Sequence, residues 1–338
     1  MTKQMPEGWE PPYPAHVAKF DESLDNLVMA YFGVQHKAQI SIDVLLCIDE
    51  LLIQKNGPEV TEKAVYTDIA GYNNQVFICY WKDQTVFQSW MVNSFLPFWN
   101  TNAEKDYSEY GFWREIIGIS TEYFETLFPN KQPAGIARLG EGFSEPVDEH
   151  GYYGGMRDRL PASSYDDLEP EVASQLTVVN TSDTVGKRIK VNAPGNLNLI
   201  RSAQDWSAVQ GKERELYLND VHPILLKGMD YLIKNPLDSG CCYMRFMTEV
   251  SADNQRLERT FGMGMFLSIK HLEAWSKSHP THTRIFDSFI AFAQKVGDQM
   301  ALNLWHEVSV LPKGAGDFQY LNCHNKTGLI PYFEAEEV

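Results

Sequence analysis

The stretch Phe112-Trp-Arg-Glu-Ile116 has a counterpart near the end of the chain, Leu304-Trp-His-Glu-Val308. Each is followed by a second aromatic stretch, Tyr123-Phe-Glu-Thr-Leu127 in the first case and Asp317-Phe-Gln-Tyr-Leu321 in the second. Because chance seldom places matched patches in the same order, the correspondence indicates an internal repeat. The two copies therefore predict one structural unit built twice.

A further correspondence lies upstream, where Trp90-Met-Val-Asn-Ser-Phe-Leu-Pro97 parallels Trp275-Ser-Lys-Ser-His-Pro280. The copies differ in their histidines, so any histidine-based site is expected in the second half. The first copy has Phe95, Phe98 and Arg114 where the second has His279, His282 and His306.

The hydrophobic pattern predicts the order strand, helix, strand, helix, strand in each half, with an extra strand in the second. Two antiparallel sheets, each with helices on one face, can bury their other faces against each other. We therefore predict an α+β fold in which residues 1–338 form a single domain, an antiparallel β-barrel with flanking helices. Its repeats span about 20–132 and 186–330, joined by a loop-rich segment, 133–185. The predicted strands are 27–35, 75–81, 112–119, 121–128, 196–202, 243–250, 259–269, 302–311 and 318–323, and the predicted helices are 40–54, 85–92, 212–233 and one beginning near 278.

The composition is typical of an ordinary globular protein, with 43% apolar and 22% charged residues. A formal charge of −16 argues against nucleic acid or an anionic membrane as partner, because both would repel the chain. The sequence contains no apolar run typical of a signal peptide or a membrane-spanning helix, so we expect a cytoplasmic protein. Five cysteines without C-x-x-C spacing argue against a disulfide framework and a zinc site.

A helix is predicted to begin at Ser278 or His279, either of which can cap it, and Pro280 suits its first turn. Apolar residues recur at helical spacing within 285–296, and His282 lies on the same stripe. The N-terminus of a helix disfavours the imidazolium ion, so His282 should stay neutral, with a lone pair free for a metal. The alternative is a core histidine hydrogen-bonded to a carbonyl.

The predicted strand 302–311 alternates, with Leu304, His306 and Val308 on one face. A histidine on the apolar face of a core strand is either a hydrogen-bonded structural residue or a functional one. Two inward histidines, His282 and His306, could face one cavity. No carboxylate completes a first-row metal site between them, and H-E-x-x-H spacing is absent. One histidine ligand in aromatic and apolar surroundings suits a haem better than a bare ion.

Other candidates carry weaker patterns. The glycine-rich segment 151–159 fits neither a P-loop nor a dinucleotide fingerprint, so its glycines can be read as surface turns. Arg159 would matter only if this loop folds over the cavity. Ser202 shares a strand face with Ile200 and could point inward, although no G-x-S-x-G surrounds it. Glu125 is interpreted as a solvated or hydrogen-bonded strand residue. The remaining histidines have no spacing that distinguishes them from solvated residues: His16, His36, His150, His222, His271 and His324.

Five stretches are distinctive when taken together: Gly151-Tyr-Tyr-Gly-Gly-Met-Arg-Asp-Arg159, Gly195-Asn-Leu-Asn-Leu-Ile-Arg-Ser-Ala-Gln-Asp-Trp206, Ser278-His-Pro-Thr-His-Thr-Arg-Ile-Phe286, Leu304-Trp-His-Glu-Val-Ser-Val310 and Leu321-Asn-Cys-His-Asn-Lys-Thr-Gly328. They resemble the aldoxime dehydratases, haem b lyases that convert aldoximes into nitriles and include phenylacetaldoxime and aliphatic aldoxime dehydratases. The resemblance runs from about residue 11 to 329. It implies the haem-binding dimeric α+β barrel fold with two ferredoxin-like repeats per chain, in agreement with the repeat described above.

The resemblance implies a homodimer that dehydrates a small-molecule aldoxime, R–CH=N–OH, whose nitrogen binds ferrous haem b. It places the axial ligand of the haem iron at His282 and the distal catalytic histidine at His306. It also assigns catalytic positions to Ser202, Arg159 and Glu125. Two other classes stay open, a haem peroxidase of related fold and a non-catalytic haem carrier or sensor.

Overall fold

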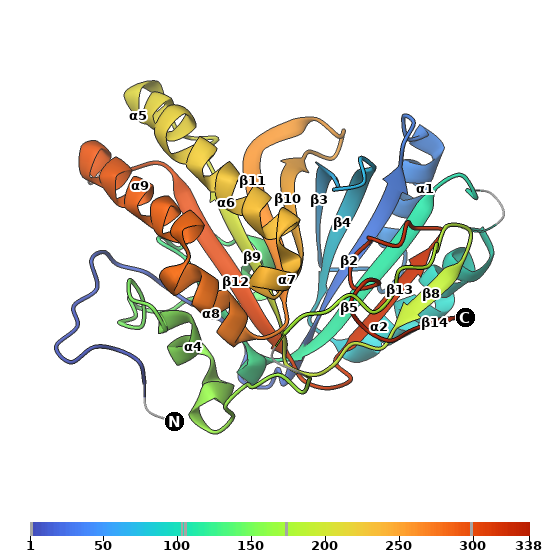
Figure 1. The fold of residues 1–338 in the computed structure, drawn as a ribbon, viewed down its shortest axis with the longest axis horizontal. Coiled ribbons are helices and arrows are strands. Elements are labelled where there is room, and N and C mark those ends of the chain that lie inside the picture. Colours follow the sequence, from blue (N-terminus) through green and yellow to red (C-terminus); the bar gives the residue numbers. More distant parts are fainter. Residues whose placement is uncertain (1–2, 103, 105–106, 173–174, 298–299) are drawn as a thin grey trace.

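The computed structural model describes residues 3–102, 104, 107–172, 175–297 and 300–338. The fold is α+β, and its main feature is a twelve-stranded antiparallel sheet that curls strongly, with helices on its outer face (Figure 1). The inner face of the sheet encloses the largest hydrophobic cluster. The helices of the two halves cover separate parts of the outer face, each over its own cluster.

In the first half, the predicted strands 27–35, 75–81 and 112–119 and the predicted helices 40–54 and 85–92 are confirmed. The predicted strand 121–128 is shorter, because its first residues form a 3-10 turn. One strand was not predicted, β3. The elements are β2 (Asn26–His36), α1 (Ile42–Leu52), β3 (Val60–Thr67), β4 (Asn73–Trp81), α2 (Gln84–Trp90), two π-helical stretches (Met91–Phe95 and Phe98–Asn102), β5 (Gly111–Ser120) and β6 (Phe124–Leu127).

In the second half, all the predicted strands are confirmed and the predicted helix 212–233 is one long, locally π-helical rod. The helix before residue 278 was not predicted. The elements are β9 (Leu197–Asp205), α5 (Gly211–Leu216), a π-helical stretch (Tyr217–Val221), α6 (His222–Lys234), α7 (Pro236–Ser239), β10 (Cys241–Val250), β11 (Arg256–Phe266), α8 (Ile269–Ser278), α9 (Pro280–Val296), β12 (Asn303–Leu311) and β13 (Gly316–Leu321).

Both halves arrange four strands in the same way. The neighbour order is β5-β2-β4-β3 in the first half and β12-β9-β11-β10 in the second. In each half the first strand therefore lies between the fourth and the third, with the second strand beyond the third. The halves meet where β3 pairs with β10, from Val65 opposite Thr248 to Lys63 opposite Val250.

The barrel expected from the sequence is present only as a half-barrel. Strands β5 and β12 would have to pair to close it, but each already has another partner. Strand β6 is added to β12, and β13 is added to β5, followed by β8 (Arg188–Val191) and β14 (Ala335–Glu337). The backbone hydrogen-bonding groups at the outer edges of β5 and β12 are thus paired with added strands and not with each other, as they would be in a closed barrel.

Buried ionic groups on the inner face link strands of both halves. The side chain of Arg201 is fully buried and forms ion pairs with Glu62 (2.6 Å) and Glu249 (3.0 Å). Successive side chains of a strand point to opposite faces, so an inward Arg201 requires Ser202 to point outward, toward the helices. Ser202, the candidate residue on β9, therefore faces the helical layer and not the barrel interior.

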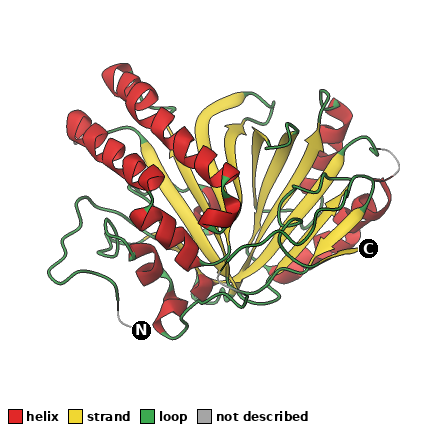
Figure 2. Cartoon of the chain, in the orientation of Figure 1, coloured by secondary structure: helices red, strands yellow, loops and turns green. Residues whose placement is uncertain are grey.

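The segment 133–185 contains only short elements among its described residues, including α4 (Gly155–Arg159), as Figure 2 shows. The N-terminal segment packs against it: the ring of Trp9 lies edge-on to Tyr152 at 5.4 Å, and its Nε1 donates to the carbonyl of His150 at 3.0 Å. Within the described residues, no helix combines the length and apolar character needed to cross a bilayer.

Candidate active site

A cavity of about 330 Å³ lies between the outer face of the second half of the sheet and the helices that cover it. Its wall is largely apolar, with Ile200, Leu225, Phe266, Trp275 and Ile285 among the lining residues. Four of the residues selected from the sequence also line it: His282, His306, Ser202 and Arg159. We call this space the catalytic cavity.

His282 enters the catalytic cavity from the first turn of α9. The helix starts as predicted: His279 is the N-cap, its side chain accepts a hydrogen bond from the backbone N–H of Thr281, and Pro280 is the first helical residue. His279, rather than Ser278, therefore caps the helix. This geometry directs His282 toward the sheet from a helix end, one turn before Ile285.

The environment of His282 keeps its ring neutral. Burial lowers the pKa of His282 to about 4, partly opposed by a hydrogen bond with the backbone of Ser276. The ring packs edge-on against Trp275 at 4.7 Å, and its Nδ1 is buried without a hydrogen-bond partner among the described residues. A neutral imidazole with an unpartnered nitrogen in an apolar wall fits the axial ligand of a haem iron.

The predicted buried stripe of α9 is only partly buried. Of the described side chains on this helix, Phe292 alone is fully buried, and Phe286 is 40% exposed. Ile285 and Phe286 instead line the catalytic cavity. The apolar spacing therefore marks a cavity wall as much as a core face, a distinction that periodicity alone cannot make.

His306 and Ser202 lie directly opposite each other on adjacent strands, β12 and β9. Residues in register share a sheet face and are close neighbours. The predicted alternation of β12 is confirmed, because Val308 and Val310 are buried on the same face as His306 while Glu307 points inward. There Glu307 accepts hydrogen bonds from Tyr80 Oη and from the backbone N–H of Ile136.

Arg159, Glu125 and His306 form one contact group. Arg159 donates from Nε to Glu125 Oε2 at 2.7 Å and from Nη2 to Glu125 Oε1 at 3.0 Å, a bidentate pair. His306 Nε2 lies 3.0 Å from Glu125 Oε1 and 2.9 Å from Arg159 Nη2. With a proton this nitrogen can donate to Glu125, and without it the nitrogen can accept from Arg159. Both protonation states of His306 Nε2 therefore have a partner.

Glu125 itself lies behind the cavity wall. Its side chain is 1% exposed, so the interpretation as a solvated residue is wrong and the hydrogen-bonded alternative is confirmed. Burial raises the pKa of the Glu125 carboxyl, but the charges and hydrogen bonds of Arg159 and His306 outweigh burial and hold it below its usual value. Pairing of β6 with β12, with Glu125 opposite Val308, brings the carboxylate to this position.

The glycine-rich loop folds over the catalytic cavity. Arg159 can belong to the site only in this arrangement, as expected from the sequence. Gly151 (φ 76°) and Gly154 (φ 106°) adopt left-handed conformations that other residues rarely take. A Cβ at Gly154 would also lie 2.6 Å from Gln4 Oε1 of the N-terminal segment. The turns place α4 so that Arg159, at its end, reaches the cavity.

His150 is a lining residue that the sequence interpretation missed. It is 1% exposed, it lines the catalytic cavity, and its ring lies 5.0 Å from that of Tyr13. Burial, together with the charge of Arg159, lowers its pKa. The interpretation as a solvated residue is therefore wrong for His150, and also for His16 and His324, which are buried. Nothing in local spacing could have identified His150, because a long-range loop contact places it.

The family model of the haem-containing dehydratases matches residues 30–329. The chain belongs to the haem-containing dehydratase family. Within the described residues, no three histidine, cysteine or acidic side chains gather as a metal-ion site. His282 is a lone neutral histidine in a largely apolar wall, and such a residue has the chemistry needed to bind a haem iron.

Several named members of the family are similar over almost their whole length. The aliphatic aldoxime dehydratase of a Pseudomonas species is 35% identical over 336 residues, which cover 98% of this chain and 94% of that protein. The phenylacetaldoxime dehydratase of Bacillus sp. strain OxB-1 is 33% identical over 339 residues, covering 99% and 96%. The fold and the length therefore agree with the family throughout.

Two solved structures superpose on the chain closely. A crystal structure of an aldoxime dehydratase matches with a TM-score of 0.89 at 34% identity, covering 98% of this chain and 94% of that chain. An aldoxime dehydratase in complex with butyraldoxime matches with a TM-score of 0.90 at 33% identity, covering 98% and 92%. The half-barrel with its outer helices is thus a fold already seen in haem-containing dehydratases.

Proposed function

We propose that this chain dehydrates aldoximes to nitriles, R–CH=N–OH giving R–C≡N and H2O, with ferrous haem b as its cofactor. One observation carries the proposal: His282 enters the catalytic cavity from a helix, while Ser202, Arg159 and His306 reach the same cavity from the sheet and loop. The similarity to aldoxime dehydratases, one of them in complex with butyraldoxime, supports the choice of substrate.

His282 would hold the haem iron, and the apolar side chains around it suit the porphyrin. When bound, ferrous haem supplies a coordination position for the oxime nitrogen and electron density for cleavage of the N–O bond. Trp275, packed edge-on against His282, restricts the orientation of the imidazole ring. The protein's contribution is thus to present one neutral nitrogen in a fixed direction and to exclude water around it.

The remaining side chains act on the oxime oxygen. Hydroxide is a poor leaving group, so the oxygen must be held and protonated as the N–O bond breaks. The Ser202 hydroxyl makes no hydrogen bond to any described residue, and it is therefore free to donate to this oxygen. Arg159 contributes a second, charged donor. Such preorganised donors stabilise charge that develops on a departing oxygen.

His306 has the proton-transfer role in this proposal. It gives one proton to the leaving hydroxyl as general acid and later removes the proton bound to carbon as general base. The two transfers leave His306 in its starting state, so the reaction balances as aldoxime to nitrile and water. Glu125 is a positioning residue, because it contacts Arg159 and His306 and lies behind them.

The decisive test uses purified holoenzyme under anaerobic conditions, offered phenylacetaldoxime and butyraldoxime. Dithionite-reduced enzyme should convert at least one of them to the corresponding nitrile, detected by chromatography, and oxidised enzyme should turn over poorly. Equal rates in the two oxidation states would contradict the role of ferrous haem. Activity that requires hydrogen peroxide would instead identify a peroxidase, and bound haem without aldoxime consumption would identify a carrier or sensor.

We also propose that residues 1–338 form one cytoplasmic domain whose halves, about 20–132 and 186–330, are ferredoxin-like repeats. The common neighbour order of the four strands in each half supports this repeat. We propose a homodimer as well, on the strength of the family resemblance. Light scattering of the purified protein measures the mass, and a value of one chain of 38.6 kDa would refute the dimer.

A further inference from the structure

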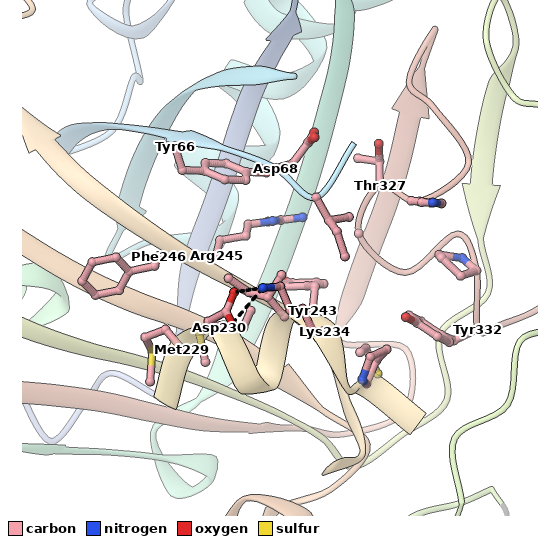
Figure 3. Close-up of a pocket in the computed structure, with 18 of the residues that line it drawn as sticks. Tyr66, Asp68, Met229, Asp230, Lys234, Tyr243, Arg245, Phe246, Thr327 and Tyr332 are labelled. Atoms are coloured by element: carbon pink, nitrogen blue, oxygen red, sulfur yellow. Dashed lines mark hydrogen bonds and ion pairs between the residues drawn. The ribbon is translucent and has the colours of Figure 1, made fainter. Parts of the chain in front are cut away.

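A second and larger cavity of about 780 Å³ lies at the junction of the two halves, and we call it the seam cavity (Figure 3). Strands β3 and β10 form only three residue pairs, the last of them Val65 with Thr248. Beyond that pair β10 continues to Cys241 without a partner in β3. The seam cavity occupies this region, between the end of β3, the unpaired part of β10 and helix α6.

The lining of the seam cavity is aromatic, and its deep charges are already paired. Tyr66, Tyr243, Phe246 and Tyr332 surround the space in Figure 3. The charged side chains within it have partners: Arg245 donates to both oxygens of Glu115 (2.8 and 2.6 Å), Lys234 lies 2.8 Å from Asp230, and Asp68 lies 2.9 Å from His324.

These pairings limit the kind of ligand that suits the cavity. Of the described charged residues that line the seam cavity, only Lys326 remains, and it is exposed at the rim. A charged ligand in the deep part of the cavity would therefore lose its hydrating water without gaining an unpaired opposite charge. An uncharged molecule with an apolar body and one small polar group loses far less on burial. The aromatic rings then supply contact area without requiring a charge.

The seam cavity and the catalytic cavity share part of a wall. Met229 of α6 and Met244 of β10 line both spaces. Gly262 of the neighbouring strand β11 leaves room for them: a Cβ there would lie 2.9 Å from Met229 Sδ and 3.2 Å from Met244 Sδ. Methionine is unbranched and has three rotatable side-chain bonds, so these two side chains can move aside at little cost. The partition between the cavities is therefore made of the most adaptable apolar side chains available.

We propose that the seam cavity is a second binding site for the uncharged aldoxime, an antechamber from which the substrate reaches the catalytic cavity past Met229 and Met244. This inference rests on the proposed function. In this proposal the substrate enters through the seam cavity beside α6, and not past the glycine-rich loop. The N-terminal segment packs on the glycine-rich loop and on α4, with Trp9 against Tyr152 and Gln4 against Asp158.

The test fills the seam cavity without touching the catalytic cavity. Leu226 of α6 lines only the seam cavity and is 41% exposed, so Leu226→Trp adds bulk there with little risk to folding. Leu46→Trp is the matched control, because Leu46 lies on α1, is 50% exposed and lines neither cavity. Ile69→Trp (55% exposed) fills the seam cavity from the opposite wall and serves as the second variant.

Two measurements on the holoenzymes decide the outcome. Calorimetric titration of the oxidised parent with phenylacetaldoxime should give two sites per chain, while the Soret band follows only the site at the haem. Leu226→Trp and Ile69→Trp should each give one calorimetric site with an unchanged Soret titration, and Leu46→Trp should keep two. In turnover, the two seam variants should lose kcat/KM by about threefold or more with kcat unchanged, because only arrival of the substrate is hindered.

The two proposals fail in different ways. A parent that is active but shows a single calorimetric site, or seam variants whose kcat/KM equals that of Leu46→Trp, would overturn the antechamber and leave the dehydratase intact. A parent holoenzyme that consumes no aldoxime would overturn the proposed function and the antechamber with it.

Discussion

Replacing Glu125 by glutamine tests the contact group behind the catalytic cavity. The substitution keeps the size of the side chain but removes the charge that Arg159 meets at 2.7 and 3.0 Å. Both partners are buried, with side chains 5% and 1% exposed. Removing one partner of a buried ion pair costs about 3–5 kcal/mol, and we take the lower figure because glutamine retains one acceptor.

The expected shift in thermal stability follows from the size of the chain. For 338 residues the unfolding entropy is on the order of 0.7 kcal/mol/K, so about 3 kcal/mol lowers Tm by roughly 4 °C. Turnover should fall as well, because Arg159 and His306 lose the group that positions them, while the Soret band stays unchanged. Scanning calorimetry and anaerobic turnover measure both. A Tm and kcat equal to those of the parent would refute a positioning role for Glu125.

The same variant should change the response of stability to acid. Since the folded pKa of Glu125 lies below its usual value, its stabilising contribution is complete above the unfolded pKa of about 4.3 and is lost as pH falls through the folded pKa. The Tm of the parent should therefore fall more steeply below about pH 4 than that of Glu125→Gln. Parallel Tm curves for the two proteins would contradict this assignment.

Three further substitutions separate the roles inside the catalytic cavity. His306→Ala should retain bound haem with an unchanged Soret band and lose turnover by at least about a hundredfold, since general acid–base catalysis contributes that much or more; loss of the haem would make His306 a ligand instead. His282→Ala should purify without iron-coordinated haem, and a parent-like Soret band would exclude it as the axial ligand. Ser202→Ala should lower kcat on the order of a hundredfold with haem content unchanged, the usual cost of losing one preorganised donor, whereas a change in KM alone would restrict Ser202 to binding.

Sequence predicts the position of a residue where the residues next to it in the chain show a clear strand or helix pattern. The alternation of β12 placed His306 on the same strand face as Val308, and the cap and proline of α9 placed His282 in its first turn. Both signals are local, because strand and helix periods are set by the backbone. Their meeting in one cavity follows from β9 and β12 pairing in register and from α9 packing over them.

The features that sequence missed depend on contacts between distant segments. Strand β3 has no apolar run, because Glu62 faces Arg201 on the inner face and Lys63 pairs with Asp49 of α1. Its polar residues look like those of a loop until their partners are known. His150 likewise becomes a cavity residue only when the N-terminal segment and α4 close around it. Long-range ion pairs and loop packing have no period to detect.

The N-terminal segment has a practical consequence for handling the enzyme. The backbone N–H of Gln4 donates a hydrogen bond to Asp158 Oδ1 of α4 at 2.9 Å, and Tyr13 lies against His150 in the cavity wall. By contrast, β14 ends the chain at the edge of the sheet farthest from β6 and β12 in the neighbour order (Figure 1). A purification tag, or a linker to a solid support, therefore belongs at the C-terminus. Enzyme immobilised there keeps its catalytic cavity away from the support.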